Sequence, residues 1–131
     1  MDEATQKMVA ELRKRLGDRK EWGYLDEHNN VVPCSLADLV ERHEGADFFE
    51  SPEHFVADDY YGEMRVSTIF LHLDHNFFGR VAGFGGPAEW FETMVFDIDG
   101  FRALWGKRYA TYADALAGHQ AALNQVMQGF K

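Results

Sequence analysis

Two carboxylates and a histidine are the sharpest group of side chains with the potential for chemistry. Asp74 and His75 end one predicted strand, and Glu92 lies early in the next one. In an antiparallel meander the end of one strand meets the start of the next, so these side chains are expected to converge, with His72 on the same face as Asp74. Such a set suits Zn²⁺, Fe²⁺ or Mn²⁺, which could activate water for hydrolysis. The alternative is that Asp74 caps the following turn and His75 bonds to the backbone.

A glycine-rich connection, residues 76–89, carries the aromatic side chains Phe77, Phe78 and Phe84. Loops of more than about 12 residues are uncommon and are often functional. The segment lacks the G-K-[ST] ending of a P-loop, which argues against phosphate binding by that mechanism. Two interpretations stay open: an aromatic flap that docks on a partner, or a loop whose phenylalanines fold back on the core.

Acidic residues are concentrated in the middle of the chain. The net charge is −9, and residues 38–63 hold nine acids against one base, Arg42. Within this segment acids recur every three residues, at Asp38, Glu41, Glu44, Asp47 and Glu50. Such a band could imitate nucleic-acid phosphates or attract a basic partner by long-range steering. The alternative is the solvated face of a helix, which is the usual meaning of such a run.

Several arginines fall on or beside predicted strands. Arg65, Arg102 and Arg108, together with Trp105, could hold an anionic nucleotide by ion pairing and stacking. The alternative is ordinary pairing between these arginines and the surplus acids.

The remaining candidate groups favour structural roles. Cys34 is the only cysteine, which excludes an internal disulfide and fits a reducing compartment. Nothing in the spacing brings it to His119, which lies on the apolar side of a predicted helix. The N-terminus has no signal-peptide pattern, and no apolar run approaches the length of about 20 residues that crosses a bilayer.

The hydrophobic periodicity predicts an α+β fold with an antiparallel meander sheet and helices packed on one face. The 131 residues are expected to form one domain, with an N-terminal helical extension at 1–20 and a core at 22–120. The order is roughly α-ββ-α-βββ-α. The expected helices are 4–16, 36–49 and the segment that Thr111 opens; the expected strands are 22–26, 31–34, 65–75, 90–97 and 101–109. Segments 50–63 and 76–89 are expected to be irregular, with turns at 28–30 and 98–100.

Several strings within residues 22–120 resemble a family of small uncharacterised proteins encoded by bacteriophages and prophages. The most specific are VSTIF at 66–70 with LDHNF at 73–77, and FETMVF at 91–96; RYAT at 108–111 and AGH at 117–119 follow. The resemblance implies a phage-related origin and a shared fold, and it implies no activity. The chain departs from the pattern in its N-terminal helix, in its acidic segment, in its longer glycine-rich loop and at His72, where the relatives usually have Gly.

Together these observations predict a non-enzymatic accessory protein that binds and inhibits a host macromolecule, such as a defence component, in the bacterial cytoplasm. The expected contact residues are Asp38, Glu41, Glu44, Asp47, Glu50, Phe77, Phe78 and Phe84. One alternative is a protein that sequesters a nucleotide signal with Arg65, Arg102, Arg108 and Trp105. Another is a metal-dependent hydrolase built on Asp74, His75 and Glu92. No cofactor besides such a divalent metal, no direct nucleic-acid binding and no membrane contact are expected, and a homo-oligomer stays open.

Overall fold

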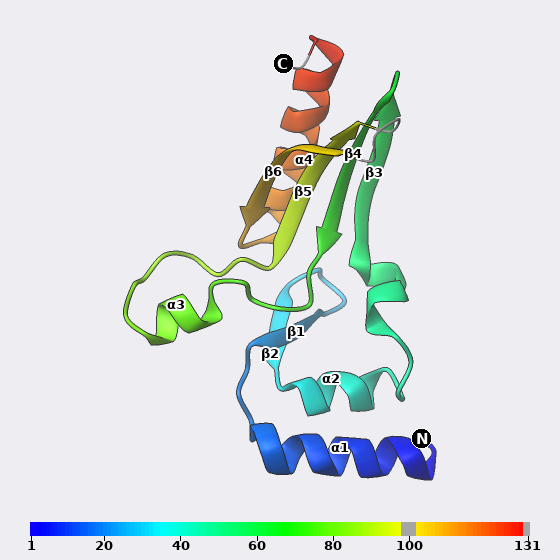
Figure 1. The fold of residues 1–131 in the computed structure, drawn as a ribbon, viewed down its shortest axis with the longest axis vertical. Helices are drawn as coiled ribbons and strands as arrows, with labels where there is room; N and C mark the ends of the chain where they lie inside the picture. Colours follow the sequence, from blue (N-terminus) through cyan, green and yellow to red (C-terminus); the bar gives the residue numbers. More distant parts are fainter. Residues whose placement is uncertain (98–101, 130–131) are drawn as a thin grey trace.

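The computed structural model describes residues 1–97 and 102–129 and has an α+β fold with two antiparallel sheets (Figure 1). A two-stranded sheet has the order β1-β2, and a four-stranded sheet has the order β3-β4-β5-β6. The predicted fold class and element order are confirmed. The predicted turn at 98–100 and the predicted start of the last strand at Phe101 lie outside the described residues.

The first part of the chain forms two helices around a hairpin. Its elements are α1 (Glu3–Leu16), β1 (Trp22–Leu25), β2 (Val31–Cys34) and α2 (Leu36–Arg42). Asp2 caps α1 through the backbone N–H of Thr5, and Ser35 caps α2 in a capping box with Asp38. The two helices pack through Val9, Ala37 and Val40.

The helix expected at 36–49 is shorter than predicted. It ends at Arg42 because Glu44 and Gly45 adopt positive φ angles of 52° and 82°, which no α-helix contains. Two short 3₁₀ helices follow, η1 (Phe48–Glu50) and η2 (Pro52–His54). The prediction extended the apolar periodicity through a point where the backbone reverses.

The four-stranded sheet contains one strand that the sequence did not predict. Its members are β3 (Phe55–Tyr61), β4 (Met64–Phe70), β5 (Phe91–Asp97) and β6 (Arg102–Tyr109). The prediction of an irregular segment at 50–63 is therefore wrong for residues 55–61. Asp58 and Asp59 disfavour a strand locally, and pairing with β4 through a hairpin that turns at Gly62 overrides that preference.

Helix α4 (Tyr112–Met127) covers one face of this sheet. Thr111 caps it through the backbone N–H of Asp114, as predicted. Two clusters of buried apolar residues lie in and around this interface: Leu25, Phe70, Trp90, Phe91 and Ala115, and Val66, Val95, Ala122 and Val126. These two clusters form a core between α4 and the two central strands, and Leu25 of β1 joins it.

The two parts of the molecule join where the chain leaves β4. The strand ends at Phe70 rather than at His75, because His72 takes a φ angle of 62° and redirects the backbone. The next residues then bond to the beginning of β1: the His72 carbonyl accepts from Gly23 N at 2.9 Å, and Asp74 N donates to the Glu21 carbonyl at 2.8 Å. Residues 72–74 thus tie the hairpin to the end of the four-stranded sheet.

Candidate functional site

The glycine-rich loop, residues 76–89, has a defined conformation and projects from the body of the protein (Figure 1). It contains a short helix, α3 (Phe77–Val81), inside the segment expected to be irregular. Backbone bonds close its base, from Leu71 N to the Trp90 carbonyl at 2.8 Å and from His75 N to the Glu89 carbonyl at 3.1 Å. The tip is therefore carried on a fixed stem.

Asp74 holds this loop from inside its base. One carboxylate oxygen accepts from the backbone N–H groups of Asn76 at 2.8 Å and Glu89 at 2.9 Å, and the other accepts from the Arg80 guanidinium. Burial opposes the charged form, but these donors hold the pKa of Asp74 below its usual range. The carboxylate is therefore an ionised anchor whose acceptor positions are occupied.

Asn76 organises the returning half of the loop. Its side-chain amide donates to the carbonyls of Gly85 at 3.1 Å and Pro87 at 2.9 Å. Gly79 also lies against this side chain, since a Cβ there would come within 2.5 Å of Asn76 Oδ1. The glycines let the backbone close tightly around one asparagine.

The tip of this loop presents apolar side chains to solvent. Phe84 is 87% exposed, Val81 66% and Phe78 59%. Phe77 is partly buried and packs edge-on against Phe78, whose ring also lies 5.6 Å from the Arg19 guanidinium. Of the two interpretations of this loop, the one in which Phe78 and Phe84 fold back on the core is wrong. The arrangement suits insertion into an apolar pocket.

The acidic segment does not form one free surface. Arg13 of α1 lies between Asp38 at 2.7 Å and Glu41 at 3.4 Å, so these two acids serve the α1–α2 contact. Asp47 caps η1 through Phe49 N, while Glu44 and Glu50 stay exposed. Figure 1 places this segment on the opposite side of the molecule from α3, so the predicted acidic and aromatic residues do not share a surface.

The predicted metal triad is wrong. Asp74 is occupied inside the loop, and Glu92 bonds to Arg108 at 3.0 Å on the sheet. His75 is exposed. Within residues 1–97 and 102–129 no group of three or more His, Cys, Asp or Glu side chains is arranged to hold a metal ion.

The predicted nucleotide pocket is also not assembled. Arg65 pairs with Asp58 on the face of the sheet opposite α4, and Arg108 pairs with Glu92. Trp105 instead packs against the cluster under α4 that includes Val66 and Val95. Arg102 lies at the far end of β6 beside Asp97, at 3.6 Å. These side chains therefore do not surround a common space, and the alternative of ordinary ion pairing describes the three arginines.

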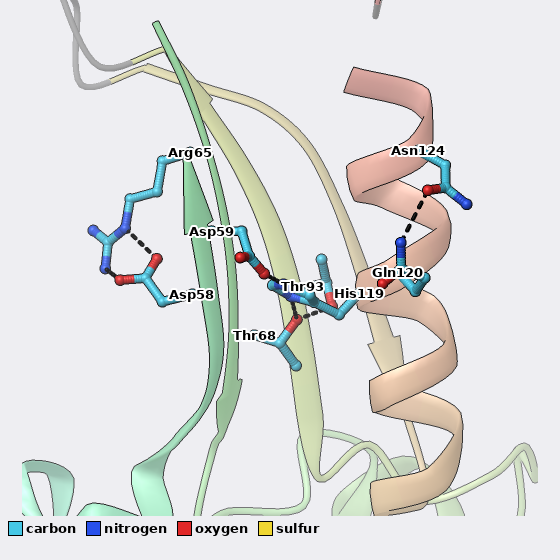
Figure 2. A network of polar contacts seen from close by, with 8 residues as sticks. All are labelled: Asp58, Asp59, Arg65, Thr68, Thr93, His119, Gln120 and Asn124. Atoms are coloured by element: carbon cyan, nitrogen blue, oxygen red, sulfur yellow. Dashed lines mark hydrogen bonds and ion pairs between the residues drawn. The ribbon is translucent and has the colours of Figure 1, made fainter. Parts of the chain in front are cut away.

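A buried polar network under α4 was missed by sequence reasoning (Figure 2). Both ring nitrogens of His119 form hydrogen bonds, Nδ1 with Thr68 Oγ1 at 2.7 Å and Nε2 with Asp59 Oδ2 at 2.7 Å. Thr68 Oγ1 lies 2.5 Å from Thr93 Oγ1. An acid, an imidazole and a hydroxyl in line resemble a nucleophilic relay, but Thr68 is fully buried and no substrate can reach it. The network fastens α4 to three strands.

A second cluster was also missed, at the junction between the two parts of the molecule. His43, Glu53, His54 and His72 each have one buried side-chain atom without a hydrogen-bond partner among the described residues. The rings of His54 and His72 stack at 5.7 Å, and His43 Nε2 lies 3.5 Å from Glu53 Oε1. The sequence feature that pointed to this cluster was His72, because the relatives in the phage resemblance usually have Gly at this position.

The single cysteine is expected to be unreactive. Cys34 ends β2 and is buried against Leu39 of α2, and this burial, reinforced by the nearby Asp38 charge, raises the pKa of its thiol to about 11. A thiol is nucleophilic as the thiolate, so Cys34 is a small core residue, as predicted.

Comparisons of this chain with protein-family models, with curated proteins and with solved structures find no match. The phage-family resemblance therefore stays a prediction. None of the helices among the described residues is both long and apolar enough to span a membrane.

Proposed function

We propose that this protein is a non-enzymatic binding protein that attaches to a host protein through the tip of the loop 76–89 and inhibits it. The observation that carries the proposal is the exposure of Phe78, Val81 and Phe84 on a loop that Asp74 and Asn76 hold in shape. Exposed aromatic side chains on a preorganised loop are typical anchors of protein interfaces, because little conformational entropy is lost when they bind.

The chemistry of the tip defines the kind of partner. The only charged side chain of α3 is Arg80, which is neutralised by Asp74. The complementary site is therefore an apolar pocket. The net charge of −9 favours a pocket with basic surroundings, which would speed encounter at low ionic strength. That the partner belongs to a defence system rests on the phage resemblance alone.

The test compares the wild type with a Phe78→Ser/Phe84→Ser double variant in affinity capture from bacterial lysate, followed by titration of the purified partner. Both rings are exposed, so the fold should be retained. Because a buried aromatic anchor contributes about 2 kcal/mol or more, we expect the loss of two anchors to raise the dissociation constant by about 1,000-fold.

Tyr61→Ser is the matched control, since Tyr61 is an exposed aromatic residue on β3, far from the loop in the fold. It should bind as the wild type does. Equal capture of the same partner by the double variant would contradict the proposal, and so would the absence of any stoichiometric partner.

A further inference from the structure

The four-stranded sheet has two outer strands, β3 and β6 (Figure 1). The outer side of such a strand presents backbone N–H and C=O groups that can pair with a strand of another chain. In β6 a bulge interrupts this edge, because Ala103 and Trp105 oppose consecutive residues of β5 and leave Leu104 without a counterpart. β3 pairs with β4 without interruption from Ala57 to Tyr61. The more regular of the two edges therefore belongs to β3.

The turn between β3 and β4 shows which backbone groups of β3 point outward. The connection has two residues, and the first, Gly62, has a φ angle of 60°, as in a type II′ hairpin. A hydrogen-bonded pair closes such a hairpin, here Tyr61 with Met64. Hydrogen-bonded and non-hydrogen-bonded pairs alternate along an antiparallel ladder. The N–H and C=O groups of Asp58 and Tyr60 therefore point away from β4.

These outward groups are free to accept a new strand. Within the part of the chain that the structure describes, no hydrogen bond from outside the β3–β4 ladder reaches the backbone of Asp58 or Tyr60. Two aromatic side chains flank the same edge on opposite faces of the sheet, because Tyr60 and Tyr61 are consecutive residues of one strand. Tyr60 is 61% exposed and Tyr61 48%. An added strand would pair with the free backbone groups and pack its side chains against both rings.

The charge around this edge selects the kind of strand. Residues 55–63, which form β3 and its turn, hold the acids Asp58, Asp59 and Glu63 and no base. Asp58 pairs with Arg65 and Asp59 bonds to His119, and both acids lie at the middle of the strand. A second copy placed edge to edge would bring acids beside acids, which disfavours self-association here. A strand that carries lysine or arginine would be attracted instead.

We propose that the free edge of β3 accepts an extended, basic segment of another protein as a fifth strand of the sheet. Main-chain hydrogen bonds provide the affinity, and the acids and the two tyrosine rings select basic and apolar side chains at alternating positions. Figure 1 places β3 and α3 on opposite sides of the molecule, so this edge is a contact surface separate from the loop 76–89. The inference therefore does not depend on the proposed function.

The first test measures amide hydrogen exchange by NMR with and without a synthetic peptide in which Lys and Val alternate. With the peptide in excess, the outward amides of Asp58 and Tyr60 should exchange at least about tenfold more slowly. The amides of Asp59 and Tyr61 point to β4 and serve as the internal control, since their exchange should not change. A peptide in which Glu and Val alternate should protect none of these amides.

A proline variant tests the backbone contact itself. Tyr60→Pro removes an outward N–H group, and proline is tolerated on an edge strand where the N–H faces solvent. Tyr60→Thr is the matched control, because it also removes the ring but keeps the N–H group. Tyr60→Pro should abolish the slowed exchange at Asp58, and Tyr60→Thr should retain it. Circular dichroism of both variants verifies that the sheet is intact.

Four results would overturn the proposal. They are unchanged exchange at Asp58 and Tyr60 with the Lys–Val peptide, equal protection by the Glu–Val peptide, equal protection in Tyr60→Pro and Tyr60→Thr, and protection that rises with protein concentration in the absence of peptide. The last result would make a second copy the occupant of this edge.

Discussion

His72 combines three unusual properties in one residue. It is fully buried, its backbone adopts a φ angle of 62°, and its Nε2 atom has no hydrogen-bond partner among the described residues. A left-handed backbone conformation is energetically costly for residues other than Gly, Asn and Asp. The Glu53 carboxylate lies near the ring, with Oε1 at 3.9 Å from Nδ1, and the other neighbours include His43, His54, Phe48 and Phe70. The surroundings therefore favour the neutral imidazole.

The first prediction concerns stability in acid. Burial lowers the pKa of His72 from 6.5 to about 4, and the charges of His54 and His43 act in the same direction against the Gly23 carbonyl. The unfolded chain then binds more protons between these two pKa values. The neutral His72 ring therefore stabilises the folded state fully above pH 6.5. This stabilisation, up to about 3 kcal/mol of unfolding free energy, is lost as the pH falls towards 4.

The measurement is urea unfolding of wild type and His72→Asn across this pH range. Asn tolerates a positive φ angle and does not titrate. As the pH falls, the unfolding free energy of the wild type should decrease more than that of His72→Asn, because only the wild type carries the titrating ring. The carboxylates affect both proteins alike. Parallel pH profiles for the two proteins would refute the prediction.

The network under α4 gives the second prediction. Replacing His119 with Leu keeps an apolar side chain of similar volume but removes the bonds to Thr68 and Asp59. Buried hydroxyls that lose a partner destabilise a fold, so the unfolding free energy should fall by about 1–3 kcal/mol. Gln120→Leu, one residue along on the exposed side of α4, should change it by less than about 0.5 kcal/mol. Similar denaturation midpoints for both variants would mean that the network contributes nothing.

At the scale of elements, the loop 76–89 depends on one buried carboxylate. Asp74 accepts from two backbone N–H groups and from Arg80, so it acts on both ends of α3 and on the return of the chain at Glu89. Charge-assisted bonds of this kind contribute about 1.5–3 kcal/mol each. The shape of the aromatic tip therefore follows from a residue that does not touch solvent.

The third prediction is that Asp74→Asn loosens this loop while leaving the sheet intact. The amides of Arg80, Ala82 and Phe84, which are bonded within the loop, should exchange with solvent deuterium at least about tenfold faster. Amides of β5 serve as the internal control. If loop and β5 keep their wild-type exchange rates, Asp74 is not the anchor. If the amides of β5 accelerate equally, the effect is global unfolding.

The whole molecule consists of two parts that meet at one end of the four-stranded sheet. α1, α2 and the β1–β2 hairpin form one part, and the four-stranded sheet with α4 forms the other (Figure 1). They meet through residues 72–74 against Glu21 and Gly23, through Leu25 of β1, which packs in one cluster with Phe70 and Phe91, and through the Glu53 carboxylate, which accepts from Leu25 N at 3.0 Å. His72 lies at this connection, so its protonation in acid should weaken the contact between the parts as well as the fold.

Elements that depend on neighbouring residues were predictable. The periodicity of Val9 and its neighbours, the Thr111 cap and the alternating burial of β4 and β5 follow from local backbone geometry, which a sequence encodes within a few residues. The aromatic character of the loop was equally visible. The sequence by itself therefore determined the fold class, most of the element order and the aromatic loop proposed for binding.

Tertiary structure decided the rest, because the partners concerned lie far apart in the chain. β3 exists through pairing with β4, Asp59 reaches His119 across 60 residues, and Arg13 removes Asp38 from the acidic surface by a contact across 25 residues. Such contacts depend on how the helices and sheets pack against one another. The same packing left the residues of the predicted metal triad apart and placed Phe78 and Phe84 in solvent.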